Sequence, residues 1–69
     1  MEKGVVRWFN AKRGYGFIQM ENGGDIFVHF SQIKGNDEYK ILYENDKVQF
    51  TVGEGKKGRP EAIDVMKVS

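Results

Sequence analysis

Residues 13 to 30, RGYGFIQMENGGDIFVHF, contain four aromatic residues, an arginine and the only histidine of the chain. Flat rings stack on nucleobases and cationic side chains bind phosphates, so these residue types in one short segment are typical of a surface for nucleic acid. Asp25 and His29 of this segment, together with Ser31 directly after it, are the residue types of a group that orients a base, the base and a nucleophile. The two chemistries demand different geometries.

Spacing argues against catalysis. Residues two apart on a strand lie about 6.8 Å apart, because each residue rises by ~3.4 Å, and we expect this separation to keep His29 and Ser31 beyond hydrogen-bond reach. One histidine, no cysteine and no carboxylate cluster leave no ligand set for a metal ion. The segment GEGKKG, residues 53 to 58, lacks the spacing of a phosphate-binding loop. We therefore expect no enzyme activity, no catalytic residue, no metal site and no cofactor.

Alternation along residues 15 to 20 and 25 to 31 decides which side chains face solvent, because successive side chains of a strand point to opposite faces. One set holds most of the rings: Tyr15, Phe17, Gln19, Asp25, Phe27, His29 and Ser31. The other set is mainly aliphatic: Gly16, Ile18, Met20, Ile26, Val28 and Phe30. Burying the first set would bury polar groups at about 1–3 kcal/mol each if unpaired, and would leave the aliphatic chains in water. We therefore predict that the rings lie outside.

The predicted outer face carries Tyr15, Phe17, Phe27 and His29, with Arg13 at its edge. An exposed aromatic patch on a monomer usually marks a binding site, and the bases of a single strand are free to stack on it, unlike those of a duplex. Two other interpretations stay open from these residues alone. The rings are cross-strand pairs that stabilise the hairpin, or they form a contact surface for another protein.

Short apolar runs separated by turn residues predict five strands, at residues 5 to 10, 15 to 20, 26 to 30, 47 to 53 and 60 to 67. A helical turn is expected around Ser31-Gln32-Ile33. Asn22-Gly23 is a strong hairpin signal, because both residues tolerate positive φ. Five short strands in so small a chain favour an all-β fold, a small barrel, because closure removes exposed sheet edges.

The last two predicted strands supply part of the core by the same alternation. Val48, Phe50 and Val52 should share the buried face of residues 47 to 53. In residues 60 to 67, Ile63 and Val65 should point inward.

Length and composition are those of one small domain, residues 1 to 69, near the lower size limit for independent folding. The start of the chain lacks the apolar stretch of a signal peptide, and no apolar run approaches a membrane span. We therefore expect a cytoplasmic protein without a membrane partner. The net charge is +1, but residues 21 to 46 are acidic while both flanking segments are basic, which indicates either two faces of opposite charge or a mixed surface.

Two motifs point to a family. Arg13-Gly14-Tyr15-Gly16-Phe17-Ile18 has the pattern of the RNA-binding signature RNP1, and Ile26-Phe27-Val28-His29-Phe30 resembles RNP2. An RNA-recognition motif needs two helices and has these signatures in the opposite order. With Gly4-Val5-Val6-Arg7-Trp8-Phe9-Asn10 before them and Ser31-Gln32-Ile33 after, residues 4 to 35 closely resemble the cold-shock domain family. Tyr39-Lys40-Ile41-Leu42 is similar to a later family pattern, whereas Arg59 stands as an insertion in what is usually Gly-Pro.

The resemblance implies a five-stranded antiparallel barrel of the OB-fold type. It implies a monomer that binds single-stranded RNA and single-stranded DNA, T/U-rich sequences preferred, as an RNA chaperone that uses no ATP. The implied stacking residues are Trp8, Tyr15, Phe17, Phe27, His29, Phe30 and Tyr39. The implied backbone and polar contacts are Arg7, Asn10, Lys12, Arg13, Asp25, Lys57 and Arg59. Alternation alone would bury Phe30 and place Trp8 on the face of Val6, so their exposure follows from the resemblance only and requires a bend in the strands.

Overall fold

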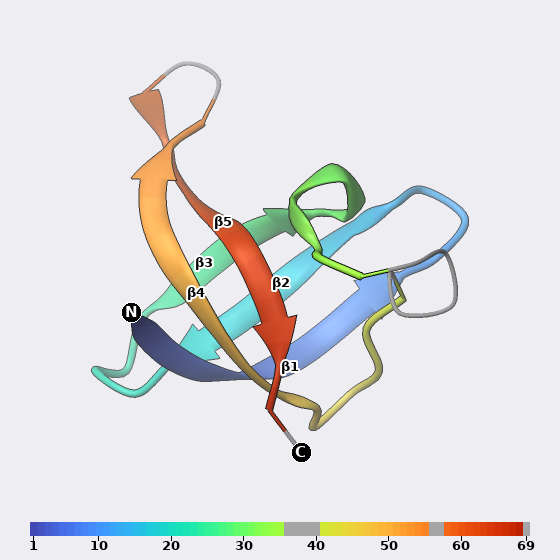
Figure 1. Cartoon of the computed structure of the whole chain (residues 1–69), viewed down its shortest axis with the longest axis horizontal. Coiled ribbons are helices and arrows are strands. Elements are labelled where there is room, and N and C mark those ends of the chain that lie inside the picture. Colours follow the sequence, from blue (N-terminus) through green and yellow to red (C-terminus); the bar gives the residue numbers. More distant parts are fainter. Residues whose placement is uncertain (36–40, 56–57, 69) are drawn as a thin grey trace.

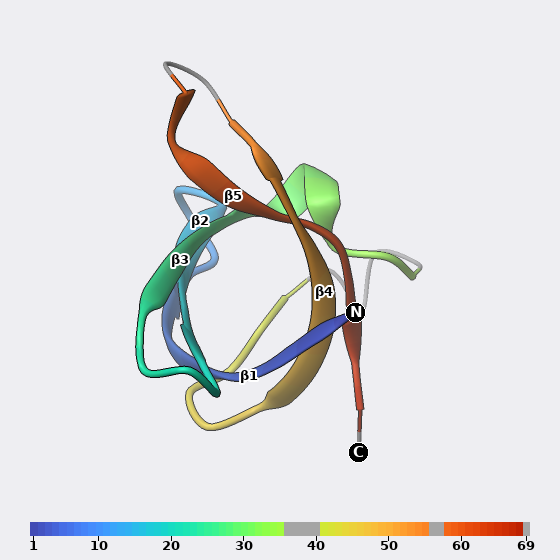
Figure 2. The ribbon, with the colours of Figure 1, turned by 90° about the vertical axis from the view of Figure 1, so that its left-hand side faces the viewer.

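The computed structural model describes residues 1–35, 41–55 and 58–68. Its five strands are β1 (Glu2–Asn10), β2 (Tyr15–Met20), β3 (Asp25–His29), β4 (Lys47–Glu54) and β5 (Pro60–Lys67), and a 3₁₀ turn, η1 (Phe30–Gln32), follows β3 directly (Figure 1). The strands close into a barrel in the order β1-β2-β3-β5-β4, and Figure 2 shows them curving around its interior. The predicted five-stranded barrel is confirmed.

One pairing differs from the expected antiparallel arrangement. Strands β3 and β5 pair in parallel, with Phe27 opposite Glu61 and Val28 opposite Ala62. All other pairs are antiparallel. A hairpin turn forces antiparallel pairing, whereas a longer connection permits either direction. The order of the strands around the barrel brings β3 next to β5, and the sequence between them places no tight turn that would set their relative direction.

The strand boundaries agree with the predictions to within a few residues. Predicted strands 15 to 20 and 60 to 67 match β2 and β5, and β4 is one residue longer than predicted. Strand β1 begins three residues earlier, because Glu2–Val5 pair with β4, and Gly4 and Val5 also pair with β2. Strand β3 ends at His29, so that Phe30 belongs to η1 and not to the predicted strand. The chain therefore leaves the sheet one residue earlier than alternation suggests.

The barrel encloses a core of aliphatic side chains around one phenylalanine. The buried apolar residues are Val6, Ile18, Ile26, Val28, Ile33, Leu42, Val48, Phe50, Ala62 and Val65, with Phe9 and Met20 packed against them. In the described part of the chain no polar or charged residue is buried. The prediction that the aliphatic set of the β2–β3 hairpin faces inward is confirmed.

Two predicted core residues lie elsewhere. Val52 is 46% exposed although it has the same parity as Phe50, because the pairing of β1 with β4 ends at Phe50 and nothing of β1 covers Val52. In β5 the inward residues are Ala62 and Val65, three apart, and Ile63 is only partly buried. The register shifts here, where Asp64 adopts a positive φ of 53°. Such a bulge inserts one residue and breaks the alternation.

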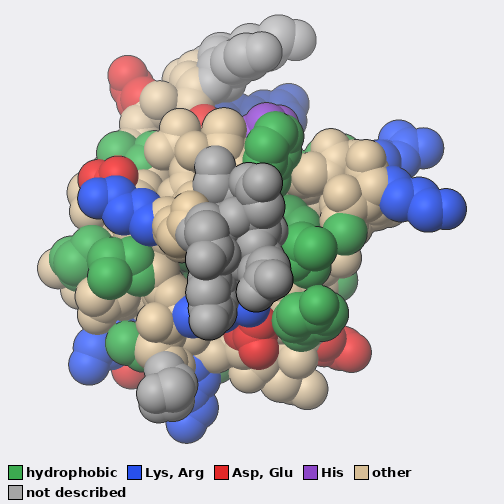
Figure 3. Space-filling model, turned by 45° about the vertical axis from the view of Figure 1, so that its right-hand side comes forward, with side chains coloured by type: hydrophobic (Ala, Val, Ile, Leu, Met, Phe, Trp, Pro, Cys, Tyr) green, Lys and Arg blue, Asp and Glu red, His purple; other side chains and the backbone are tan. Residues whose placement is uncertain are grey.

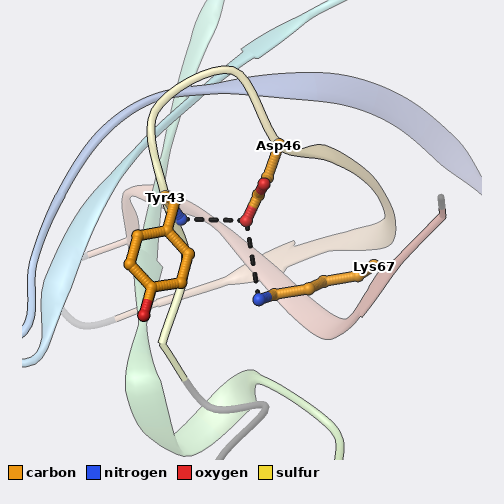
Figure 4. Close-up of polar contacts among 3 residues, drawn as sticks. All are labelled: Tyr43, Asp46 and Lys67. Carbon is orange, nitrogen blue, oxygen red and sulfur yellow. Dashed lines mark hydrogen bonds and ion pairs between the residues drawn. The ribbon is translucent and has the colours of Figure 1, made fainter.

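Hydrogen bonds fix two short turns of the barrel. Gly23 has φ +98°, and the Met20 amide donates to the Gly24 carbonyl at 2.7 Å, so the Asn22-Gly23 hairpin is confirmed. At the turn before β4, the Asp46 carboxylate accepts from the Tyr43 amide at 2.9 Å and pairs with Lys67 at 3.5 Å (Figure 4). Because Lys67 ends β5, this carboxylate ties the turn to the strand that flanks β4. No helix in the described ranges is long and apolar enough to span a bilayer.

Gly16 marks the closest approach of β1 and β2. A Cβ on Gly16 would lie 2.7 Å from the Phe9 Cα and against the Trp8 carbonyl, and backbone atoms cannot move aside as a flexible side chain can. We predict that Gly16→Ala lowers the free energy of unfolding by about 1–3 kcal/mol through overpacking. Urea denaturation measures it. Gly24→Ala is the control, because its Cβ would meet the flexible end of Met20 at 3.3 Å and the Asn22 Oδ1 at an ordinary 3.7 Å. Equal midpoints for both variants would contradict the prediction.

Candidate nucleic-acid interface

Six aromatic rings gather where β1, β2 and β3 meet and where β3 runs into η1. We call them the aromatic platform: Trp8, Tyr15, Phe17, Phe27, His29 and Phe30. Four rings form a continuous set of contacts, with ring centroids 5.9 Å apart for Trp8–Tyr15, 5.5 Å for Trp8–Phe17, 5.7 Å for Tyr15–Phe27 and 5.8 Å for Phe17–Phe27. The His29 and Phe30 rings lie 4.8 Å apart.

The platform arises from strand register. Phe17 pairs with Phe27 and Tyr15 with His29 across the β2–β3 hairpin, so the rings that alternation predicts to lie outside are direct cross-strand neighbours. All four are half-buried. Such contacts also stabilise the hairpin, so the structural interpretation of the rings and the binding interpretation describe the same side chains. Figure 3 shows hydrophobic side chains beside the histidine on one face, with Lys and Arg side chains projecting at the side.

Trp8 reaches the outside through a bulge in β1. Val6 pairs with Ile18 and Trp8 pairs with Phe17, so an advance of two residues along β1 corresponds to an advance of one residue along β2. The extra residue, Arg7, breaks the alternation. Val6 is therefore buried while Trp8 is 44% exposed. The bend that the exposure of Trp8 requires is present at this position.

Phe30 reaches the outside because the strand ends before it. The Phe30 amide donates to the Gly14 carbonyl at 2.8 Å, which ties η1 to the β1–β2 loop. Gly14 has φ +80°, and a Cβ there would lie 2.7 Å from the Phe30 ring. A glycine is needed for both reasons, and the Phe30 ring, which is 45% exposed, lies over it.

Cationic side chains lie at the margin of the platform. Arg7 is exposed, with Nη1 3.5 Å from the Gln19 Oε1 atom, and the exposed Lys12 and Arg13 stand in the β1–β2 loop. Asn10 shapes that loop, because its Oδ1 accepts from the amides of Lys12 and Arg13, both at 3.0 Å. Its side-chain acceptor is thus engaged, and its NH₂ group is the part that remains for a ligand.

A groove of about 700 Å³ continues from the platform toward β5. It is lined by Phe17, Asp25, Phe27, His29, Ser31, Gln32, Gly55, Arg59, Pro60 and Glu61. The parallel pairing of β3 with β5 creates it by setting Glu61 opposite Phe27. The predicted residues Asp25 and Arg59 therefore share one groove with three rings of the platform. Tyr39 and Lys57, two further predicted contacts, lie outside the described residues.

Residues 2–68 match the family described as the 'Cold-shock' DNA-binding domain. The chain belongs to the cold-shock domain family. It is 49% identical over 69 residues to the major cold shock protein of Streptococcus pyogenes serotype M1, with all of both chains covered. It is 52% identical over 67 residues to cold shock protein CspC of Bacillus subtilis (strain 168), covering 97% of this chain and 98% of that protein.

A solved structure supports the fold. The Drosophila protein described as "drosophila Unr CSD456" is 26% identical, with a TM-score of 0.77. The match covers 99% of this chain and 26% of that one, so this cold-shock domain spans about a quarter of the Drosophila chain. Family membership supports nucleic-acid binding of the cold-shock type, and the OB-type barrel implied by the sequence is confirmed.

One expectation about this cold-shock domain is wrong. His29 and Ser31 are not separated beyond hydrogen-bond reach, because their Nδ1 and Oγ atoms lie 2.9 Å apart. The strand rise does not apply, since Ser31 lies in η1 and the chain turns directly after His29. The contact does not form a catalytic triad in the described residues: Asp25 lies at the other end of β3 and makes no hydrogen bond to His29.

Several groove residues are not indicated by the sequence motifs. Gln32, Pro60 and Glu61 line the groove, but none belongs to either RNP motif. Glu61 and Pro60 come to the site only because β5 lies beside β3. Gln32 lies in η1, the helical turn that the sequence predicts, but the sequence does not assign its side chain to the site.

Proposed function

We propose that this cold-shock domain binds single-stranded RNA and single-stranded DNA, with bases stacked on the aromatic platform and phosphates bound at its margin. The observation that carries the proposal is the continuous contact of four outward rings across β1, β2 and β3. Unpaired bases stack on such rings for about 1–3 kcal/mol each. Bases in a duplex already stack on each other and are not available to it.

The proposed roles follow the two groups of side chains. Trp8, Tyr15, Phe17, Phe27, His29 and Phe30 stack on bases, and Tyr39 is proposed to join them. Arg7, Lys12, Arg13, Arg59 and Lys57 contact phosphates, while Asn10 and Asp25 offer hydrogen bonds to bases. T/U-rich strands are proposed to bind best. Their small bases are the least stacked in the free strand, so less stacking is lost when they move onto protein rings.

The biological role we propose is that of an RNA chaperone. Stacking and phosphate contacts of this kind trap unpaired segments, which shifts RNA hairpins toward open strands without ATP. We propose that the protein acts as a monomer, one domain over residues 1 to 69, in the cytoplasm. A chain without cysteine suits a reducing compartment.

Titration of Trp8 fluorescence tests the proposal, because Trp8 is the only tryptophan and is part of the platform. We expect quenching by oligo-dT and oligo-U and much weaker quenching by a duplex of equal length. No quenching by any single strand at low salt would defeat the proposal. Sedimentation at several protein concentrations tests the alternative of a protein interface, which predicts self-association that salt hardly affects.

Salt dependence measures the phosphate contacts separately. Each contact to a single strand contributes about −0.7 to the slope of log K against log salt, so we expect about −3.5 if Arg7, Lys12, Arg13, Lys57 and Arg59 all engage. Arg13→Gln should make this slope shallower by about 0.7 and weaken binding to T-rich and U-rich strands alike. Lys3→Gln removes an exposed charge from the far end of β1 and should leave the slope unchanged. Equal slopes in all three proteins would refute the role of Arg13.

A further inference from the structure

His29 caps the turn that carries Phe30. It is the last residue of β3 and the N-cap of η1, and its Nδ1 atom accepts from the Ser31 amide at 3.2 Å. The Ser31 Oγ lies 2.9 Å from the same nitrogen. The His29 Nδ1 atom is therefore contacted by both the amide and the hydroxyl of Ser31. This contact is separate from the cross-strand pairing that places the ring beside Tyr15.

The contact determines where the imidazole carries its proton. A neutral imidazole has one donor nitrogen and one acceptor nitrogen. Because Nδ1 accepts from a backbone N–H, it cannot itself carry hydrogen, and the proton of the neutral ring is on Nε2. The Ser31 hydroxyl then donates to Nδ1 rather than accepting from it. The hydrogen bond made by one ring nitrogen thus sets the chemistry of the other.

Nε2 remains the nitrogen that can meet a ligand. His29 lines the groove with Phe17 and Phe27, and among the described residues no hydrogen bond involves Nε2. The carboxylates of Asp25 and Glu61 also line the groove, but neither bonds to the ring. His29 therefore offers a ring face for stacking and one N–H donor for an oxygen of the bound strand.

We propose that Ser31 is a positioning residue for nucleic-acid binding: its amide keeps the proton on Nε2, its hydroxyl helps to fix the His29 ring, and Nε2 then donates to an oxygen of the bound strand. The inference rests on the proposed function of the aromatic platform. Ser31 is exposed in η1 and contributes nothing to the core, so its substitution tests positioning without disturbing the barrel.

Nitrogen NMR of the free protein tests the first half of the proposal. The chain has one histidine, so both ring-nitrogen signals belong to His29, and their different couplings to the ring protons tell Nδ1 from Nε2. With the ring neutral, we expect Nδ1 to show the shift of an unprotonated nitrogen and Nε2 that of a protonated one. A proton on Nδ1 would overturn the proposal. This measurement needs no ligand, so its outcome does not depend on whether the proposed function is correct.

Affinity for oligo-dT tests the second half. Ser31→Ala should weaken binding about 3- to 10-fold, the effect of losing one hydrogen bond that positions a contact group. Ser31→Thr keeps the hydroxyl and should bind nearly as the original chain does. Unchanged affinity in Ser31→Ala would overturn the proposal. Absence of binding by the original chain itself would instead refute the proposed function.

A double-mutant cycle separates positioning from direct contact. His29→Phe keeps a ring for stacking but removes both nitrogens. If Ser31 acts through His29, Ser31→Ala should cost nothing further in the His29→Phe background. The same 3- to 10-fold loss in that background would show that Ser31 touches the strand itself and would overturn the positioning role. Thermal unfolding of each variant, expected near that of the original chain, confirms that the comparison is between folded proteins.

Discussion

Phe27→Ala should weaken binding of oligo-dT about 10- to 100-fold, the largest loss expected from a single ring. Phe27 touches the rings of both Tyr15 and Phe17 and lines the groove beside β5, so its removal takes away one stacking surface and loosens two others. A lost stacking contact is worth about 1–3 kcal/mol, and each 1.4 kcal/mol is about tenfold in affinity. Anisotropy of a labelled oligonucleotide measures the change without relying on Trp8.

Two further variants separate loss of the ring from loss of the fold. Phe27→Leu keeps an apolar side chain but no flat ring, and it should bind nearly as weakly as Phe27→Ala. Tyr43→Ala removes an aromatic that is 62% exposed and lies outside the platform, and it should leave affinity within about twofold. If Tyr43→Ala weakened binding as much as Phe27→Ala, or if Phe27→Ala bound normally, the platform would not be the binding surface.

Phe50→Ala should remove most of the stability of the barrel. Among the described residues Phe50 is the largest fully buried side chain, with none of its surface exposed, and truncating such a phenylalanine costs about 3–5 kcal/mol. Small domains have total stabilities at the low end of about 5–15 kcal/mol. We therefore expect a chain that is largely unfolded at 37 °C. Urea denaturation followed by circular dichroism measures the loss.

A matched pair of valines on the same strand provides the control. Val48 and Val52 are the same residue type with the same parity on β4, but Val48 is fully buried and Val52 is 46% exposed. Val48→Ala should cost about 2–3 kcal/mol from lost methyl burial and the cavity left behind. Val52→Ala should cost less than about 1 kcal/mol. Similar losses of stability at the two positions would contradict the prediction, because they would mean that the buried part of β4 extends beyond Phe50 to Val52.

The β2–β3 hairpin was predictable because its information is local. Alternation in two adjacent strands leaves two choices, and the cost of burying Gln19, Asp25 and His29 selects one of them. Asn22-Gly23 sets the turn, which then brings Phe17 opposite Phe27. No distant part of the chain is needed for this result. The platform's central rings therefore follow from residues 15 to 29.

The bulges were not predictable in the same way. Alternation fails at Arg7 in β1 and at Asp64 in β5, where one residue is added to the register. Both bulges serve closure, because a strand must bend sharply to pair with neighbours on both sides of a small barrel. The partners that demand the bend lie far away in the chain. The resemblance to cold-shock domains predicts that Trp8 is exposed, and the register shift at Arg7 explains this exposure.

The residue order by itself determined which face of the hairpin carries the rings, since burying polar groups in so small a core costs more than leaving aromatics partly in water. Tertiary structure alone decided the parallel contact of β3 with β5, the groove that this contact forms with Glu61 and Arg59, and the bond from Ser31 to His29. The physical reason is that parity describes side chains along one extended strand. It says nothing about where a strand ends, or which remote strand closes the barrel.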